Sequence, residues 1–206
     1  MKKYSLLLWT FICVLSVSAQ TLNDAQIRQR VNQAAAAMKT LQCDFVQIKH
    51  LKMLNEEMLA QGKMYYQQSN KLRWEYTNPY TYTFVLNGDK VLLKNQQRND
   101  VIDVNQNKIF REIARIMMSS VVGNSLLDNK TFKTTITINN SEWIATQIPK
   151  RKDMRQIFQR IVLHFNPQCA VVSCVEMIEK NGDKTVINLK NIRTNETLNA
   201  SIFAVH

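Results

Sequence analysis

The chain has 206 residues and a strongly basic balance, with 27 lysines and arginines against 16 aspartates and glutamates, so its net charge is +11. It contains only four glycines and lacks a P-loop, a GxGxxG turn, a G-x-S-x-G elbow and an H-E-x-x-H helix, which excludes the enzyme classes that carry these motifs. The excess positive charge favours an anionic membrane surface or an acidic protein as partner, or serves solubility alone.

The first 19 residues have the three parts of a secretory signal peptide. Basic residues precede an apolar run over Leu6–Val17, and small residues lead up to Ala19. The run is shorter than the roughly 20 residues that span a bilayer, which argues against a retained anchor. We therefore expect cleavage after Ala19, a periplasmic location, and a single domain over residues 20–206. An exported chain of this kind is not expected to bind nucleic acid.

The first predicted elements are one helix and two strands. Apolar residues at helical spacing predict a helix over Leu22–Met38, with Asn23 or Asp24 as its cap. Alternation then predicts strands over residues 43–48 and 56–66, joined by a polar loop through His50 and Lys52.

Residues 62–91 form the most aromatic stretch of the chain. Here apolar residues alternate with polar ones in two runs, separated by Asn78-Pro79, and Asn87-Gly88-Asp89 closes the stretch as a hairpin turn would. The alternation places one set of side chains on a single face of two strands. That set is Leu72, Trp74, Tyr76, Tyr82, Phe84 and Leu86.

The remaining chain returns to strands after one further helix. Short strands are predicted over residues 90–93 and 100–104, and helical spacing follows over Lys108–Val122, ended by Gly123. Five more strands are predicted over residues 133–138, 143–148, 159–165, 170–179 and 184–192. The pattern predicts an α+β fold that is mainly antiparallel β, a curved sheet or open barrel with helices laid on it.

The cysteines and histidines do not form a catalytic or metal-binding pattern. Beyond the signal peptide the cysteines are odd in number, and Cys169 and Cys174 are predicted on one strand, too far apart to pair. Either Cys43 pairs with one of them, or all three are buried free thiols. His164 alternates with apolar residues, which is typical of a solvent-facing or structural histidine. We predict no metal site, no cofactor and no catalytic residue.

The aromatic strands have two possible uses. In a narrow barrel their side chains fill a packed core, whereas in a wide open one they line an apolar cavity for a ligand. The residues by themselves leave both uses open.

Several short motifs follow one another along the chain. They are Phe45-Val46-Gln47, Gly62-Lys63-Met64-Tyr65, Arg73-Trp74-Glu75-Tyr76 with Pro79, Asn87-Gly88-Asp89-Lys90-Val91, Ile148-Pro149-Lys150, and Val186–Leu189 with Asn191 and Phe203. Each motif is short, but in this order they resemble the LolA-type periplasmic carriers, which move lipoproteins to the outer membrane.

This resemblance implies an unclosed half-barrel of about ten to eleven strands, with helices forming a lid over an apolar cavity. The implied function is a monomeric, non-enzymatic carrier that takes acylated lipoproteins from an inner-membrane exporter towards an outer-membrane acceptor that the sequence does not identify. A lipid- or lipoprotein-sensing module of the same fold is the alternative. The implied cavity residues are Leu72, Trp74, Tyr76, Tyr82, Phe84 and Leu86, and the implied lid residues are Phe110, Ile113, Ile116 and Met117.

One position departs from the family pattern. The family commonly has an arginine before a proline at the end of the Gly-x-Leu strand, where the arginine holds the lid by hydrogen bonds. Here the aligned pair is Gln68-Ser69. Arg73 or Arg115 would have to take over that role.

A basic stretch over Pro149–Arg155 is predicted to be a loop. Lys150, Arg151 and Lys152 in it are candidates for docking on an acidic inner-membrane exporter or on anionic headgroups. A solvated loop without a partner is the alternative.

Overall fold

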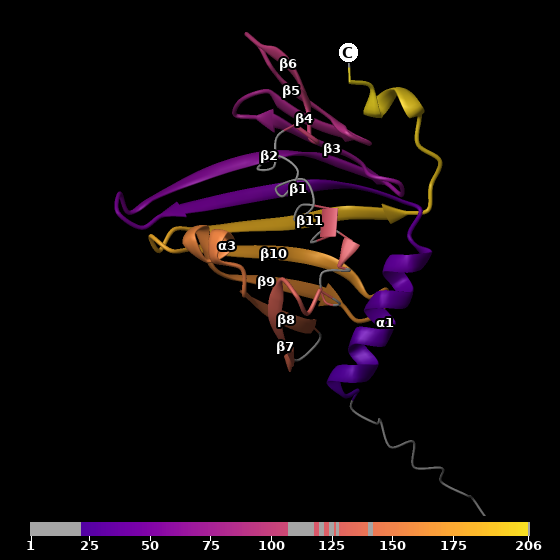
Figure 1. The fold of residues 1–206 in the computed structure, drawn as a ribbon, viewed down its shortest axis with the longest axis vertical. Coiled ribbons are helices and arrows are strands. Elements are labelled where there is room, and N and C mark those ends of the chain that lie inside the picture. Colours follow the sequence, from indigo (N-terminus) through magenta and orange to yellow (C-terminus); the bar gives the residue numbers. More distant parts are fainter. Residues whose placement is uncertain are drawn as a thin grey trace, which may run out of the picture.

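The computed structural model describes residues 22–106, 118–119, 122–123, 126, 128–139 and 142–205. Eleven strands in these ranges form one antiparallel sheet in the order β6-β5-β4-β3-β2-β1-β11-β10-β9-β8-β7 (Figure 1). The edge strands β6 and β7 do not pair with each other, so the sheet is an unclosed half-barrel, as predicted. The strands are β1 (Thr40–Leu51), β2 (Glu56–Gln67), β3 (Lys71–Asn78), β4 (Tyr82–Asn87), β5 (Lys90–Asn95), β6 (Asn99–Asp103), β7 (Phe132–Asn139), β8 (Glu142–Pro149), β9 (Phe158–Asn166), β10 (Val171–Glu179) and β11 (Lys184–Thr194).

Helix α1 (Asp24–Ala37) begins with a complete capping box, which confirms the predicted helix and its cap. The Asn23 side chain accepts a hydrogen bond from the Gln26 backbone, and the Gln26 side chain accepts one from the Asn23 backbone. Both bonds satisfy amide groups that the first helical turn would otherwise leave unpaired. The helix contacts β10 and buries Ile27 and Val31, which are at most 1% exposed.

The first hairpin is longer than the sequence indicated. Alternation becomes less regular after Ile48, but β1 continues to Leu51, and His50 pairs with Glu57 on β2. The predicted loop is therefore a turn over residues 52–55 only. In Figure 1 this hairpin extends beyond its neighbours, the β10–β11 turn and helix α3 (Lys152–Ile157).

Two glycines at predicted element ends have the expected backbone φ angles. Gly88 has a φ of +61°, which a two-residue turn between β4 and β5 favours. Gly123 has a φ of +80° and its amide donates to the Ser119 carbonyl, as expected at the end of a helix. The rest of the helix predicted over Lys108–Val122 lies almost entirely outside the described residues.

The outer face of the sheet at β3–β5 is covered by the chain's own C-terminal segment. The 3-10 helix η2 (Ala200–Phe203) packs Phe203, which is 0% exposed, against Val85 and Leu92. Asn87 Nδ2 also donates to the Phe203 carbonyl at 3.0 Å. This packing leaves the other face, called the inner face below, to carry the main core.

No described helix combines the length and the apolar character that crossing a membrane requires.

Candidate functional site

The predicted aromatic residues do share one face, and they pair directly across two strands. In the β3–β4 register, Leu72 faces Leu86, Trp74 faces Phe84 and Tyr76 faces Tyr82. Four of the six are buried at 0 to 7% exposure, whereas Tyr76 and Tyr82 are half-buried. We call these six residues, together with Phe45 of β1, the aromatic wall.

Phe45 joins the wall because Gly62 leaves room for its ring. The two residues are paired across β1 and β2, and a Cβ at residue 62 would overlap the Glu75 carbonyl and lie 2.5 Å from Phe45 Cζ. The ring of Phe45 instead contacts Trp74 at 4.4 Å between centroids and Tyr76 edge-on at 5.2 Å. Gly62 and Phe45, which belong to two separate sequence motifs, thus pack directly against each other.

Polar atoms on the aromatic wall are few, and one of them, Trp74 Nε1, is buried without a hydrogen-bond partner among the described residues. The Tyr76 hydroxyl donates to Gln47 Oε1 at 2.9 Å, and its ring lies 5.4 Å from that of Tyr80. Burial raises the pKa of Tyr76, with the neighbouring Tyr80 adding to the effect, and burial followed by Asp100 raises the pKa of Tyr82. Both phenols are therefore neutral at physiological pH. The wall presents an uncharged surface of rings and aliphatic groups.

The opposite half of the inner face is aliphatic at its centre and carries buried rings at one end, where Trp143 and Phe165 pair across β8 and β9. Leu163 is 0% exposed at the centre of this half and pairs with Ala145 on one side and Val175 on the other. Ile161 and Ile187 complete what we call the aliphatic wall. Helix α1 contacts this half of the sheet through β10, and it is part of the continuous core.

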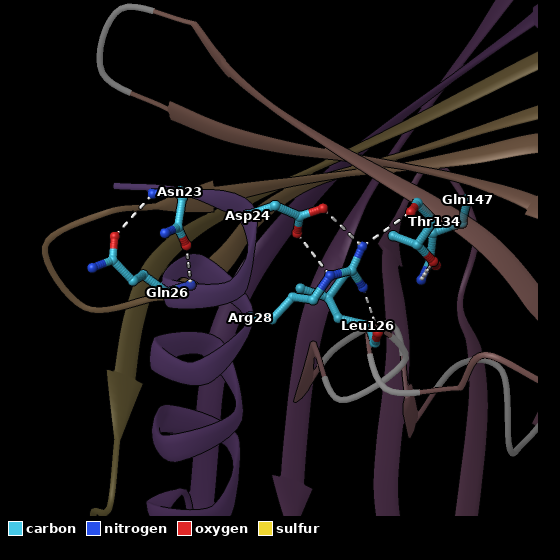
Figure 2. Close-up of polar contacts among 7 residues, drawn as sticks. All are labelled: Asn23, Asp24, Gln26, Arg28, Leu126, Thr134 and Gln147. Carbon is cyan, nitrogen blue, oxygen red and sulfur yellow. Dashed lines mark hydrogen bonds and ion pairs between the residues drawn. The ribbon is translucent and has the colours of Figure 1, made fainter. Parts of the chain in front are cut away.

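Arg28 of α1 ties the helix to two segments remote in sequence (Figure 2). Its guanidinium donates to the Leu126 carbonyl at 2.9 Å and to the Thr134 carbonyl on β7 at 3.0 Å. Asp24, one turn earlier, fixes the guanidinium through a 2.7 Å ion pair. Leu126 itself is 1% exposed. We call this set of contacts the Arg28 clamp; nothing in the sequence pattern indicated it, because its partners are about a hundred residues away.

Gln68 and Arg73, which the sequence raised in connection with the lid, contact different parts of the chain. Gln68 still reaches α1, because its Nε2 donates to the Ala36 carbonyl at 3.3 Å. Arg73 points to the outer face, where it pairs with Glu75 and donates to the Ile202 carbonyl, so the expectation that it could hold the lid is wrong. Successive side chains of a strand point to opposite faces, and Arg73 lies between the inward-facing Leu72 and Trp74, so its side chain faces outward. Arg115 lies outside the described residues.

The predicted lid residues Phe110, Ile113, Ile116 and Met117 also lie outside the described residues. They remain predictions.

The basic stretch is not a loop throughout, because α3 begins at Lys152. Asp153 in the first helical turn receives the Arg151 guanidinium at 2.6 Å, and the Arg151 hydrogen bond is the main cause that lowers the Asp153 pKa. Lys150 donates to the Asn129 carbonyl at 2.6 Å, and Lys152 is exposed. A helix forms where the charged run indicated a loop, since Met154 is buried in the core and anchors it.

The three cysteines are free, so the Cys43 pairing considered from the sequence is not present. Burial, followed by Asp44, raises the pKa of Cys43 to about 12, and burial, followed by Glu176, raises that of Cys174 to about 11. Both are therefore neutral thiols at physiological pH, unsuited to nucleophilic attack. Cys169 is exposed, contrary to the expectation of burial, because it lies in the turn before β10 rather than on the strand.

His164 lies half-buried on the outer face, between two carboxylates. Its Nδ1 lies 3.0 Å from Glu142, and its Nε2 lies 3.4 Å from Glu176, an ion-pair distance without hydrogen-bond alignment. Glu176 also pairs with Lys184 at 2.9 Å. Within the described ranges, no three histidine, cysteine, aspartate or glutamate side chains are grouped so that they could hold a metal ion.

Comparisons with known proteins agree on one family. A family model described as outer membrane lipoprotein carrier protein LolA matches residues 36–206. A protein of Methylococcus capsulatus named outer-membrane lipoprotein carrier protein is 25% identical over 198 residues, covering 96% of this chain and 88% of its own. A protein of the same name from Nitrosospira multiformis is 24% identical over 166 residues, covering 80% and 77%.

Solved structures show the same fold at low identity. An uncharacterized conserved protein from Thermus thermophilus is 10% identical with a TM-score of 0.54, covering 87% of this chain and 91% of its own. The complex of MucA and MucB from Pseudomonas aeruginosa contains a chain that is 8% identical with a TM-score of 0.54, covering 87% and 61%. The family match over residues 36–206, together with the half-barrel, shows that this chain belongs to the LolA family of outer membrane lipoprotein carrier proteins.

Proposed function

We propose that the chain is a monomeric periplasmic carrier that holds the acyl chains of lipoproteins against the aromatic wall. It receives them from an inner-membrane exporter and releases them towards the outer membrane. Binding and release involve no covalent chemistry, metal or cofactor, so the protein is a non-enzymatic binding protein.

The observation that carries this proposal is the pairing of large apolar side chains across β3 and β4 on the inner face. Three cross-strand pairs give an uninterrupted apolar strip, and Phe45 extends it over Gly62 onto β1. Its ends differ in burial, because Leu72 and Leu86 are at most 5% exposed while Tyr76 and Tyr82 are half-buried. An acyl chain would enter at the tyrosine end and lie along the strip.

The energetics fit a reversible carrier. Burying a methylene group is worth about 0.8 kcal/mol, so an acyl chain in water needs an apolar cover to stay dispersed. The aromatic wall offers rings and few hydrogen-bonding groups, so the contact depends on area rather than on chain-specific recognition. Such a surface suits cargo that shares its acyl chains but differs in protein sequence.

The Arg28 clamp has a role in this proposal as the contact that keeps α1 and the Leu126 segment against the sheet. Its two carbonyl acceptors lie on segments far apart in sequence, so the bonds close the inner face on the β7 side. Loading of cargo requires access to this face. We propose that weakening the clamp favours an open form, and that Phe110, Ile113, Ile116 and Met117 also bind the acyl chains, as the family resemblance implies.

The experiment that tests the function is mass spectrometry of the chain purified from the cell envelope. We expect acylated N-terminal peptides to co-purify with the wild-type chain and to be lost from Tyr82→Glu, which places a charge on the aromatic wall. Thr83→Glu is the matched control, because Thr83 is the next residue and faces the outer side. The proposal fails if no acylated peptide accompanies the wild-type chain, or if both variants retain it equally.

A further inference from the structure

The tip of the β1–β2 hairpin exposes a cluster of aliphatic side chains. Met53 is 90% exposed and Leu54 64%, and Met58 and Leu59 on the following strand are 53% and 50% exposed. Isolated exposed apolar residues are common, but here four lie within seven positions at one protruding end, with Met58 and Leu59 on opposite faces of β2. We call residues 52–59 the hairpin tip.

The hairpin tip is held in place by neighbouring turns. The Lys52 amide donates to Asp183 Oδ1 in the β10–β11 turn at 2.9 Å, and the Leu54 amide donates to the Leu51 carbonyl at 3.2 Å. The Lys52 stem lies on Gly182, where a Cβ would overlap it. Its apolar side chains are therefore presented on a fixed support at low cost in conformational entropy.

Exposed cations surround this end of the sheet. Helix α3 and the β10–β11 turn lie at the same end, as Figure 1 shows, and the Lys180 amide donates to the Ile157 carbonyl, which joins them. Ile157, 56% exposed, adds a further aliphatic group. At this end of the sheet, the exposed cations for which the described part of the chain shows no ion pair include Lys52, Lys152, Arg155 and Lys180.

Two carboxylates at this end pair with a lysine or an arginine. Glu179 pairs with Lys49 at 3.3 Å and Asp153 with Arg151 at 2.6 Å, whereas Glu57 lies 2.8 Å from the His50 ring. Glu56 and the buried Asp183 are the other acids on these three segments. The four unpaired cations outnumber the three acids Glu56, Glu57 and Asp183 by one, so a small positive balance surrounds these aliphatic side chains.

We propose that this end of the sheet docks on a bilayer that contains anionic phospholipid. Met53, Leu54, Met58 and Leu59 enter the headgroup region, while Lys52, Lys152, Arg155 and Lys180 bind phosphate groups around them. A protruding aliphatic tip fits a soft, laterally continuous surface better than a protein site, which would need a matching groove. Interfacial binding of this type combines buried apolar area with attraction to anionic lipid.

The test is co-sedimentation of the cargo-free, processed chain with vesicles of phosphatidylglycerol and phosphatidylcholine, compared with phosphatidylcholine alone. We expect binding to the anionic vesicles that weakens as salt is raised. The double variant Met53→Ser with Leu54→Ser should bind the anionic vesicles at least tenfold more weakly than the wild-type chain. The double variant Lys152→Glu with Arg155→Glu should show a similar loss, and only on the anionic vesicles. The control is the double variant Val101→Ser with Ile138→Ser, whose side chains are 50% and 49% exposed on the edge strands, and it should change the affinity less than twofold.

A second measurement locates the tip itself. In Leu54→Trp, brominated lipid should quench the new indole, whereas Val101→Trp should not be quenched. Absence of vesicle binding by the wild-type chain, equal binding by the tip variant, or an unquenched Trp at residue 54 would each overturn the proposal. Since cargo is absent from these experiments, failure of the lipoprotein-carrier function would leave their outcome unchanged.

Discussion

The two walls of the inner face share one architecture but differ in what covers them. In the aliphatic wall, Leu163 pairs with Ala145 and Val175, and α1 contacts the same half of the sheet. In the aromatic wall, rings pair across β3 and β4, and the tyrosine end stays half-buried. The comparison teaches that apolar alternation builds both walls into one continuous core, and that the chain leaves only the tyrosine end of the aromatic wall half-covered.

The largest effect is expected at Gly62, the contact on which the aromatic wall depends. Gly62→Ala places a Cβ against the Glu75 carbonyl and the Phe45 ring, so backbone or ring must move. We expect the free energy of unfolding to fall by about 3 kcal/mol or more, measured by urea denaturation. Gly88→Ala is the control: no atom lies within 4 Å of its Cβ, and the positive φ alone should cost about 1 kcal/mol. Equal losses for the two variants would contradict this account of Gly62.

Leu163 tests whether the aliphatic wall is core only. Leu163→Ala removes a fully buried side chain and should lower the free energy of unfolding by about 3 kcal/mol. Its affinity for a fluorescent fatty acid, measured below the unfolding transition, should stay within about twofold of wild type. A large loss of affinity without further unfolding would show that cargo also contacts this half.

Arg28 tests how the cover is held. Arg28→Met leaves the Leu126 and Thr134 carbonyls without their charged donor, which we expect to cost about 2 kcal/mol of stability. Hydrogen exchange should accelerate around Leu126 and on β7. Arg30→Met is the matched control, because Arg30 is exposed on the same helix. Unchanged exchange in Arg28→Met would show that the clamp does not hold this region closed.

Tyr82 is the counterpart of Leu163 in the comparison. Tyr82→Ser removes a half-buried ring at the open end of the aromatic wall, so stability should change by only about 1 kcal/mol. Fatty-acid affinity should fall about tenfold, because that ring area is lost to the acyl chain. Fluorescence titration measures this. Wild-type affinity in Tyr82→Ser would place the cargo elsewhere.

The smallest effect concerns pH. Burial raises the pKa of Cys43 from 9.0 to about 12 and also raises those of Tyr76 and Tyr82. The folded state therefore keeps the thiol and the two phenols neutral, whereas in the unfolded state they ionise above their ordinary pKa values. The free energy of unfolding is therefore at its full value below about pH 9 and falls as the pH rises above it. We expect Cys43 to account for a loss of about 1 kcal/mol between pH 9 and 10, which Cys43→Ala removes, and Cys174, whose pKa burial raises to about 11, to account for a similar loss, measured by urea denaturation at each pH. A flat profile in the wild-type chain would contradict the burial of Cys43.

The sequence was sufficient for the strands and for the face that each side chain occupies. Alternation through Leu72, Trp74 and Tyr76 determines the inner face, and the Gly88 turn determines the β4–β5 hairpin. Both signals are local, so a pattern can carry them. The short helix α3 was missed because its charged residues dominate the pattern, while a single buried residue, Met154, anchors it.

Long-range contacts could not be read from the sequence. Arg28 bonds to carbonyl groups, which every residue has, so no residue type marks the partner. The exposure of Met53 and Leu54 depends on how far β1 and β2 extend beyond the β10–β11 turn, a property of register between distant strands. These contacts therefore appear only once the sheet is assembled.

The central claim, that the aromatic wall holds acyl chains, is tested most directly by photo-crosslinking in cells. A photoreactive phenylalanine derivative at Tyr82 faces the inner side, and the same group at Thr83 faces the outer side. The account predicts crosslinks to acylated lipoproteins from residue 82 and none from residue 83. Crosslinks from residue 83 alone, or from neither position, would contradict it.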